Sequence, residues 1–99
     1  MTPVLVLMDS DTVTREQYDQ LSREVNWKEQ KPEGLMMHVG SCDSAGHMHV
    51  VELWESGELM HSFFVSRVEP AMQKLGLPEP KATVYQVHDL QFTKSNLLE

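Results

Sequence analysis

The chain has 99 residues, and its 8 Lys and Arg against 15 Asp and Glu give a formal net charge of -7. A chain of this length forms one domain and buries only about two-thirds of its unfolded surface, so self-association would add stability. The negative charge repels phosphate backbones and anionic lipid, which argues against nucleic acid and membranes as partners. A single cysteine, Cys42, excludes an intramolecular disulfide, and with no signal-peptide pattern at the N-terminus we expect a cytoplasmic protein.

The first two predicted elements are a strand and a helix. Residues 3–9 are apolar at odd and even positions alike, which is typical of a strand covered on both faces and central in its sheet. Thr14 and Gln17 have the spacing of a capping box, which predicts a helix from there to about Trp27. Its apolar stripe, which should pack on the sheet, is Tyr18, Leu21 and Val25.

Residues 34–56 predict a β-hairpin. If Asp43 to Gly46 is a four-residue turn, Cys42 faces His47, and counting back along the strands pairs His38 with Val51 and Leu35 with Trp54. One face then carries Met36, His38, Gly40, His49, Val51 and Leu53, and the other carries Leu35, Met37, Val39, Met48, Val50, Glu52 and Trp54.

The last third of the chain predicts a second helix and a fourth strand. Ser56 caps the helix, whose inward stripe is Leu59, Met60, Phe63 and Phe64. Pro70 should break or kink it before a last segment closed by Gly76. Residues 83–89 form the fourth strand. The domain is expected to span residues 1–92, with 93–99 as a tail.

These elements occur in the order β-α-β-β-α-β, which predicts an α+β, ferredoxin-like fold with a four-stranded antiparallel sheet. Two helices cover only one face of such a sheet, yet the first three strands are apolar on both faces. A second copy of the same chain is the simplest cover for the other face. We therefore expect a homodimer.

Several segments resemble one superfamily. They are the strand 34–39 with His38, the Trp54-Glu55-Ser56 corner, the helix with Phe63-Phe64, the stretch 70–76, and Val87-His88-Asp89. Over about residues 3–90 the chain resembles the dimeric α+β barrel superfamily near the antibiotic-biosynthesis monooxygenase group, in particular a subgroup of small bacterial proteins. The resemblance implies a homodimer with a pocket between sheet and helices in each protomer. Members include oxygenases that act on phenols without metal or flavin, haem-degrading enzymes, isomerases and decarboxylases, so the fold does not select a reaction.

The haem-degrading members differ from this chain at two positions. They have a tryptophan about where Phe64 stands and a haem-ligating histidine near Ala71 or Met72, and the nearest helical histidine here, His61, does not match. We therefore expect no haem. The sequence also lacks the glycine-rich and CxxC motifs of nucleotide and redox cofactors, so no cofactor is expected.

His38 is the first candidate for a catalytic residue, because it interrupts an apolar strand. A histidine there is either a core residue paired with a carbonyl or carboxylate, or a general base that lines a cavity. His88 has the same two interpretations, and the two strands are expected at opposite edges of the sheet. The candidate ligand-binding residues, each of which could equally belong to the core, are Trp54, Tyr85, Met36 and Phe64.

Two further polar features have open interpretations. Glu52 lies between apolar neighbours and either orients a histidine, acts as an acid, or is a solvated rim or interface carboxylate. His47 and His49 form an H-x-H pair, but no third ligand falls at a suitable spacing, so we predict no metal site.

Two functional hypotheses follow from the sequence. The first is a cofactor-independent, monooxygenase-like or isomerase-like enzyme that acts on a small, mostly apolar or phenolic molecule, with His38 as its base. The second is a non-catalytic dimeric binding or interaction protein in which the histidines are structural. Whether His38 faces a cavity of a few hundred Å³ distinguishes them.

Overall fold

The first strand of the chain is a central strand of the sheet. In the computed structural model, which describes residues 2–94, β1 (Val4–Thr14) pairs antiparallel with β3 (His47–Trp54) and β4 (Lys81–Gln86). β2 (Leu35–Cys42) pairs with the other edge of β3, so the strand order is β2-β3-β1-β4. The four-stranded antiparallel sheet and the β-α-β-β-α-β order are confirmed, and β2 and β4 are the two edges.

Local signals define where the first helix begins and ends. α1 (Arg15–Val25) begins at the predicted capping box, in which the Thr14 hydroxyl accepts from the Gln17 amide at 3.3 Å and the Gln17 side chain accepts from the Thr14 amide at 3.0 Å. The helix ends two residues earlier than predicted, because Asn26 adopts the left-handed conformation and donates to the Ser22 carbonyl.

The second helical segment has three parts. α2 (Gly57–Phe63) is followed by the π-helical turn η1 (Phe64–Val68) and by α3 (Glu69–Leu75). The irregularity lies just before Pro70, where Glu69 donates to the Phe64 carbonyl across a wide turn. Because Pro70 has no amide hydrogen, it leaves the preceding turn without one regular α-helical bond. Gly76, with a φ of 67°, ends α3 as predicted.

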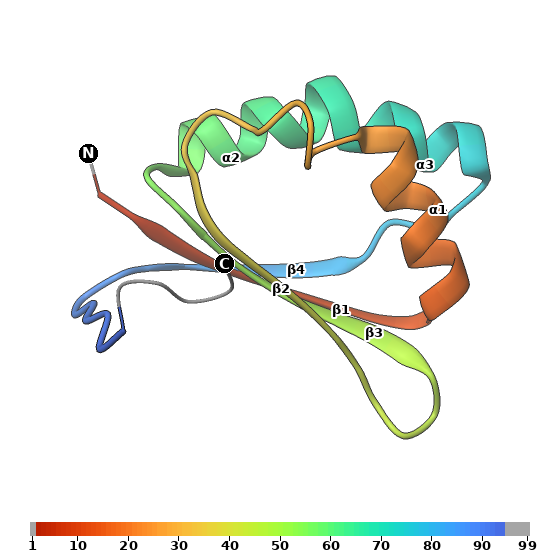
Figure 1. Cartoon of the computed structure of the whole chain (residues 1–99), viewed down its shortest axis with the longest axis horizontal. Coiled ribbons are helices and arrows are strands. Elements are labelled where there is room, and N and C mark those ends of the chain that lie inside the picture. The colour runs from red at the N-terminus through yellow and green to blue at the C-terminus, as the bar shows by residue number, and fades with distance from the viewer. Residues whose placement is uncertain (1, 95–99) are drawn as a thin grey trace.

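All the helices lie on one face of the sheet (Figure 1). The core between the two layers contains Val6 and Trp54 from the sheet and Phe63 and Ala71 from the helices. The opposite face carries apolar residues on all four strands, as their pairing shows: Leu5 pairs with both Leu53 and Tyr85, and Val51 pairs with both Leu7 and Val39. The prediction of a sheet that is apolar on both faces and covered by helices on one is confirmed.

The predicted register of the hairpin is wrong by one residue along most of its length. The Asp43 amide donates to the His47 carbonyl at 2.9 Å, and Gly46 has a φ of 86°, so the turn contains three residues rather than four. Cys42 consequently pairs with Met48 rather than His47. Only the predicted pair Leu35 and Trp54 is correct, because an irregularity between Leu35 and Met37 absorbs the extra residue.

This shift changes which side chains share a face. His38 pairs with Glu52 and not with Val51. The predicted separation of His38 from Glu52 is therefore wrong, and both side chains lie on the helix-covered face of the sheet with Trp54. A turn that is shorter by one residue thus places His38 beside Glu52.

The fourth strand begins and ends earlier than predicted. β4 covers Lys81–Gln86 rather than residues 83–89, and the Val87 amide then donates to the Pro3 carbonyl at 2.9 Å. His88 lies beyond the strand and is exposed. Of the predicted tail, residues 95–99 lie outside the described residues, so the boundary at residue 92 stays a prediction. None of the helices in residues 2–94 is long and apolar enough to cross a membrane.

A histidine between two carboxylates holds the hairpin to β1. The His49 ring contacts Asp9 at 2.6 Å and Asp43 at 2.7 Å, all at the protein surface. Hydrogen bonds to Asp9 and then Asp43 raise the pKa of His49 above 6.5, and the hydrogen bond with His49 is the main reason that the pKa of Asp43 falls to about 2. The three side chains form a charged clamp in the folded protein.

We expect this clamp to make the local stability of the hairpin depend on pH in a bell-shaped way. The His49 contribution is complete below its ordinary pKa of 6.5 and is lost as the pH rises through the raised value. The Asp43 contribution is complete above 3.8 and is lost as the pH falls towards about 2. Amide hydrogen exchange of residues 42–48, divided by the intrinsic exchange rate, should be slowest at pH values between the lowered pKa of Asp43 and the raised pKa of His49. In the His49→Asn variant this minimum of the relative exchange rate should disappear. A variant that keeps the minimum would show that the clamp does not hold the hairpin.

Candidate functional site

His38 lies in a chain of hydrogen bonds that joins three elements. Its Nε2 is 2.5 Å from the hydroxyl of Tyr18 on α1, and its Nδ1 is 2.8 Å from Oε2 of Glu52 on β3. The other oxygen of Glu52, Oε1, accepts from the indole N–H of Trp54 at 2.9 Å. Tyr18, His38, Glu52 and Trp54 therefore form one continuous polar network, which we call the His38 network.

The chemistry of these groups assigns their hydrogens in the neutral state. An ionised carboxylate only accepts, so Nδ1 of His38 carries the hydrogen that is donated to Glu52. Nε2 is then the basic nitrogen, and it accepts from the Tyr18 hydroxyl. This order of carboxylate, imidazole and hydroxyl is the arrangement by which proteins orient a histidine as a base.

Burial shields the Glu52 and Trp54 end of the network from water, while Tyr18 and His38 are half-buried. Glu52 is only 5% exposed, and its carboxylate is compensated by the two donors from His38 and Trp54. Burial raises the pKa of the Tyr18 hydroxyl above its ordinary value; the nearby Ser22 hydroxyl lowers it, and the negative charge of Glu52 raises it. Tyr18 is thus a neutral donor at neutral pH. Within residues 2–94, no buried side-chain nitrogen or oxygen lacks a hydrogen-bond partner.

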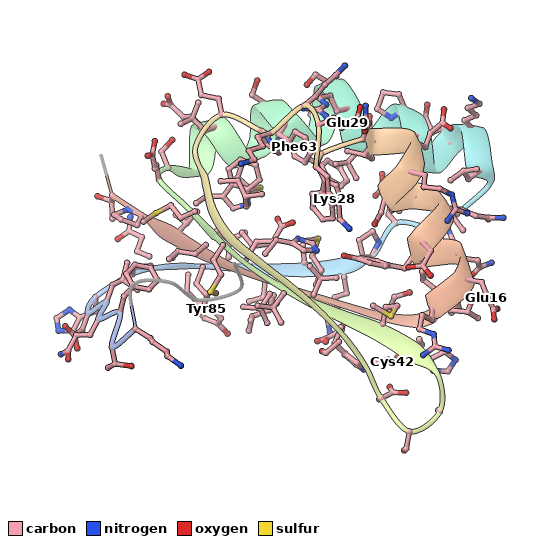
Figure 2. The ribbon with its side chains drawn as sticks, viewed as in Figure 1. Glu16, Lys28, Glu29, Cys42, Phe63 and Tyr85 are labelled. Atoms are coloured by element: carbon pink, nitrogen blue, oxygen red, sulfur yellow. The ribbon has the colours of Figure 1, made fainter. Side chains whose placement is uncertain are left out.

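Aromatic rings surround the imidazole. Trp27, in the connection after α1, meets His38 edge to face with the ring centres 3.8 Å apart, and it stacks on Phe63 at 6.5 Å. Phe63 also contacts Trp54, with ring centres 5.5 Å apart, and it projects from the helical layer towards the sheet (Figure 2). Arg67 lies over Phe63 and donates to the Val25 carbonyl at 2.7 Å, which ties the second helical segment to the end of α1.

A cavity of about 310 Å³ lies between the sheet and the helices, and the His38 network forms part of its wall. Most of the lining is apolar, with contributions from β1, β3, β4 and all the helical segments. The ionisable side chains on the wall are Tyr18, His38, Glu52, His61 and Glu79. A cavity of this size with a few convergent polar groups suits a small, mostly apolar molecule with one hydroxyl or carbonyl.

A second, more open groove is lined by α1, by the connection that follows it and by the start of β2. It shares Tyr18, Ser22, Trp27 and His38 with the cavity, and it also contains Met36. These four shared residues therefore stand between the cavity and the groove. We call this wall the Tyr18 partition.

The structure separates the six residues predicted for the site. His38, Trp54 and Phe64 line the cavity, although Trp54 is fully buried and its N–H is bonded to Glu52. Met36 is 42% exposed and lines the outer groove instead.

The remaining two predicted residues do not reach His38. Tyr85 lies on the face of the sheet away from the helices and is 56% exposed (Figure 2). His88 follows β4, at the opposite edge of the sheet from His38, and does not line the cavity. The predicted opposite-edge placement of the two histidines' strands agrees with the strand order.

Three residues around His38 were not among the predicted site residues: Tyr18, Trp27 and Glu52. Tyr18 fits the apolar stripe of α1, and Trp27 fits the end of a helix, so neither was a candidate. For Glu52, the expected contact with a histidine is present, and a solvated rim position is wrong because the side chain is buried. Its interpretations as an acid and as an interface carboxylate stay predictions. The turn sequence Asp43-Ser-Ala-Gly46 was the available signal, since glycine at its last position suits a three-residue turn.

The prediction of no metal site concerned the H-x-H pair of His47 and His49. Within it, no cluster of three or more His, Cys, Asp and Glu side chains could hold a metal ion. His49 of the H-x-H pair uses both ring nitrogens on Asp9 and Asp43.

No protein-family model matches the sequence, and no curated protein matches it closely. Solved structures do match. An antibiotic-biosynthesis-monooxygenase-like protein from Deinococcus radiodurans is 18% identical, with a TM-score of 0.60 over 96% of this chain and 100% of that one. A dimeric ferredoxin-like protein of unknown function from Thermobifida fusca is 13% identical, with a TM-score of 0.59 over 87% and 92%.

A third match is SnoaB, a cofactor-independent oxygenase from Streptomyces nogalater. It is 7% identical, with a TM-score of 0.59 over 93% of this chain and 96% of that one. The chain has the ferredoxin-like α+β fold. This fold is the one that the sequence resemblance to the dimeric α+β barrel superfamily implied. At these identities the likeness establishes the fold alone, so any activity is inferred from the site.

Proposed function

We propose that the protein binds a small, mostly apolar or phenolic molecule in the cavity between the sheet and the helices and removes a proton from it, with His38 as the base. The observation that carries this proposal is the His38 network, a buried carboxylate, imidazole and hydroxyl in the wall of an otherwise apolar cavity. Proton removal from a phenol or an activated carbon acid suits imidazole at cellular pH. SnoaB, which has the same fold, is a cofactor-independent oxygenase, and this supports an enzymatic role for the fold without a cofactor.

We further propose that the protein is a homodimer joined through the face of the sheet that the helices leave bare. Apolar residues of all four strands meet on that face, and Val39 and Tyr85 are 40% and 56% exposed in the single chain. A monomer seldom leaves a continuous apolar face in water. A structural neighbour with the same fold is dimeric, which supports this arrangement.

A coloured phenol tests the proposed base directly. Para-nitrophenol is a small apolar phenol whose anion absorbs visible light, so the absorption of the bound probe reports its ionisation. We expect the wild-type protein to lower the pKa of bound para-nitrophenol by at least about one unit, which is a tenfold change. In His38→Gln the bound probe should return to its solution behaviour. His47→Gln, at the turn end of the hairpin, is the control and should behave as the wild type.

The competing function is a binding protein without catalysis. One observation favours it: both ring nitrogens of His38 already have partners within the chain. A wild-type protein that binds para-nitrophenol but leaves it neutral, with His38→Gln binding it equally well, would support this alternative. That result would contradict a role for His38 as a base.

A further inference from the structure

His38 lines the cavity, but both of its ring nitrogens are already occupied by partners in the chain. Glu52 occupies Nδ1 and Tyr18 occupies Nε2, while the edge-to-face contact with Trp27 covers part of the ring. Its side chain is 18% exposed. A ligand can reach the basic nitrogen only by displacing the Tyr18 hydroxyl.

Tyr18 has accepting capacity that His38 lacks, because its oxygen carries two lone pairs and the nearby Ser22 hydroxyl can occupy only one of them. Its hydroxyl donates its one hydrogen to Nε2 of His38, and a phenolic oxygen can accept as well as donate. As part of the Tyr18 partition, Tyr18 also lines both the cavity and the outer groove. It is thus placed to accept a hydrogen bond from a ligand while it donates one to His38.

We propose that Tyr18 is the catalytic residue that touches the substrate and that it carries the proton between the substrate and His38. This inference rests on the proposed function and names the atom through which that function acts. Glu52 is a positioning residue, because its two carboxylate oxygens accept from His38 and Trp54 and so hold the imidazole in the required tautomer.

The proton movements balance without any further reactant. As the bond between the substrate and its acidic hydrogen breaks, that hydrogen bonds to the Tyr18 oxygen. The original hydroxyl hydrogen of Tyr18 moves at the same time to Nε2 of His38. The products are a substrate anion, a neutral Tyr18 and an imidazolium whose charge faces the Glu52 carboxylate. Tyr18 never becomes a free anion, which agrees with the raised pKa of its hydroxyl.

This geometry also defines the substrate class. The molecule must place one acidic O–H or C–H at the Tyr18 hydroxyl, and the remainder must fit the apolar cavity of about 310 Å³. Small phenols and enolisable ketones meet both conditions. A substrate whose reacting group carries a permanent charge would be costly to bring into the apolar cavity without a partner.

Gly40 on β2 leaves the room that the Tyr18 hydroxyl needs. A Cβ atom at position 40 would lie 2.9 Å from that hydroxyl oxygen and 3.1 Å from its ring carbon, so Gly40→Ala must displace the end of the Tyr18 side chain. Gly57→Ala is a matched control, because its Cβ would meet only Val4 at the ordinary distance of 3.8 Å. Gly40→Ala therefore moves the hydroxyl without removing any ionisable group.

The decisive experiment measures the anionic fraction of bound para-nitrophenol in wild type, Tyr18→Phe, Gly40→Ala and Gly57→Ala. The ratio of anion to neutral probe is independent of how much probe is bound. We expect Tyr18→Phe and Gly40→Ala to reduce this ratio at least tenfold, and Gly57→Ala to leave it unchanged. The unfolding midpoints of all four proteins identify any variant that has failed to fold. If Tyr18→Phe does not fold, the result for Gly40→Ala decides the test.

Each outcome has a distinct meaning. If Tyr18→Phe ionises the probe as well as the wild type, or better because Nε2 has been freed, the inference is overturned while His38 remains the base. If the wild type does not ionise the bound probe, the proposed function itself fails, and the role of Tyr18 fails with it.

Discussion

Replacing Glu52 with alanine is expected to lower the free energy of unfolding by about 3–5 kcal/mol, because it breaks a buried charged network by removing one partner. The variant leaves the His38 Nδ1–H and the Trp54 indole N–H without their acceptor in a region where Glu52 is only 5% exposed. Urea unfolding, followed by the fluorescence of the two tryptophans, measures the loss. In a domain of this size such a loss is a large part of the total stability.

Glu55→Ala is the matched control, since Glu55 is exposed on the same segment of chain. It should change the free energy of unfolding by no more than about 0.5 kcal/mol. Glu52→Gln should be intermediate, at about 1–3 kcal/mol, because the amide keeps one acceptor oxygen but presents a second donor to the remaining N–H. A Glu52→Ala protein as stable as Glu55→Ala would show that the network is not formed in solution.

Introducing a charge on the bare face of the sheet is expected to separate the proposed dimer. Val51 pairs with Leu7 and Val39 on that face, so Val51→Glu would bury an unpaired carboxylate from each protomer in the interface. The dissociation constant should rise at least about 100-fold, equivalent to about 2.7 kcal/mol. Native mass spectrometry or analytical ultracentrifugation over a range of concentrations measures it.

Val65→Glu provides the comparison on the helical side of the molecule. Val65 lies in η1 and is 46% exposed, so the same substitution there adds the same charge away from the proposed interface. This variant should remain dimeric. A monomeric wild-type protein, or dissociation of both variants alike, would contradict the interface on the bare face.

The fold was largely predictable because its signals are local. The capping box at Thr14 and Gln17, the apolar strand that contains Val4 and Val6, and the glycine that ends α3 each act through near neighbours in the sequence. The apolar residues on both faces of the strands then predicted that both faces of the sheet are covered. These features do not depend on how the strands are aligned.

The site depends on alignment, and it was predicted less well. A three-residue turn instead of a four-residue turn brings His38 opposite Glu52, and no apolar pattern opposed the wrong register because both faces of the hairpin are apolar. Tyr18 reaches His38 across 20 positions of sequence, from a helix whose stripe fits core packing equally well. His38 was identifiable, since a histidine within an apolar strand requires a partner or a cavity, and here it has both.

The most direct test of the proton transfer is nitrogen NMR of the His38 imidazole, with the protein labelled at histidine nitrogen, before and after addition of para-nitrophenol. The free protein should show Nδ1 protonated and Nε2 unprotonated, as the contacts with Glu52 and Tyr18 require. With the probe bound, both nitrogens should become protonated while the probe becomes an anion. An imidazole that keeps its free-state signals while the probe occupies the cavity would contradict His38 as the proton acceptor.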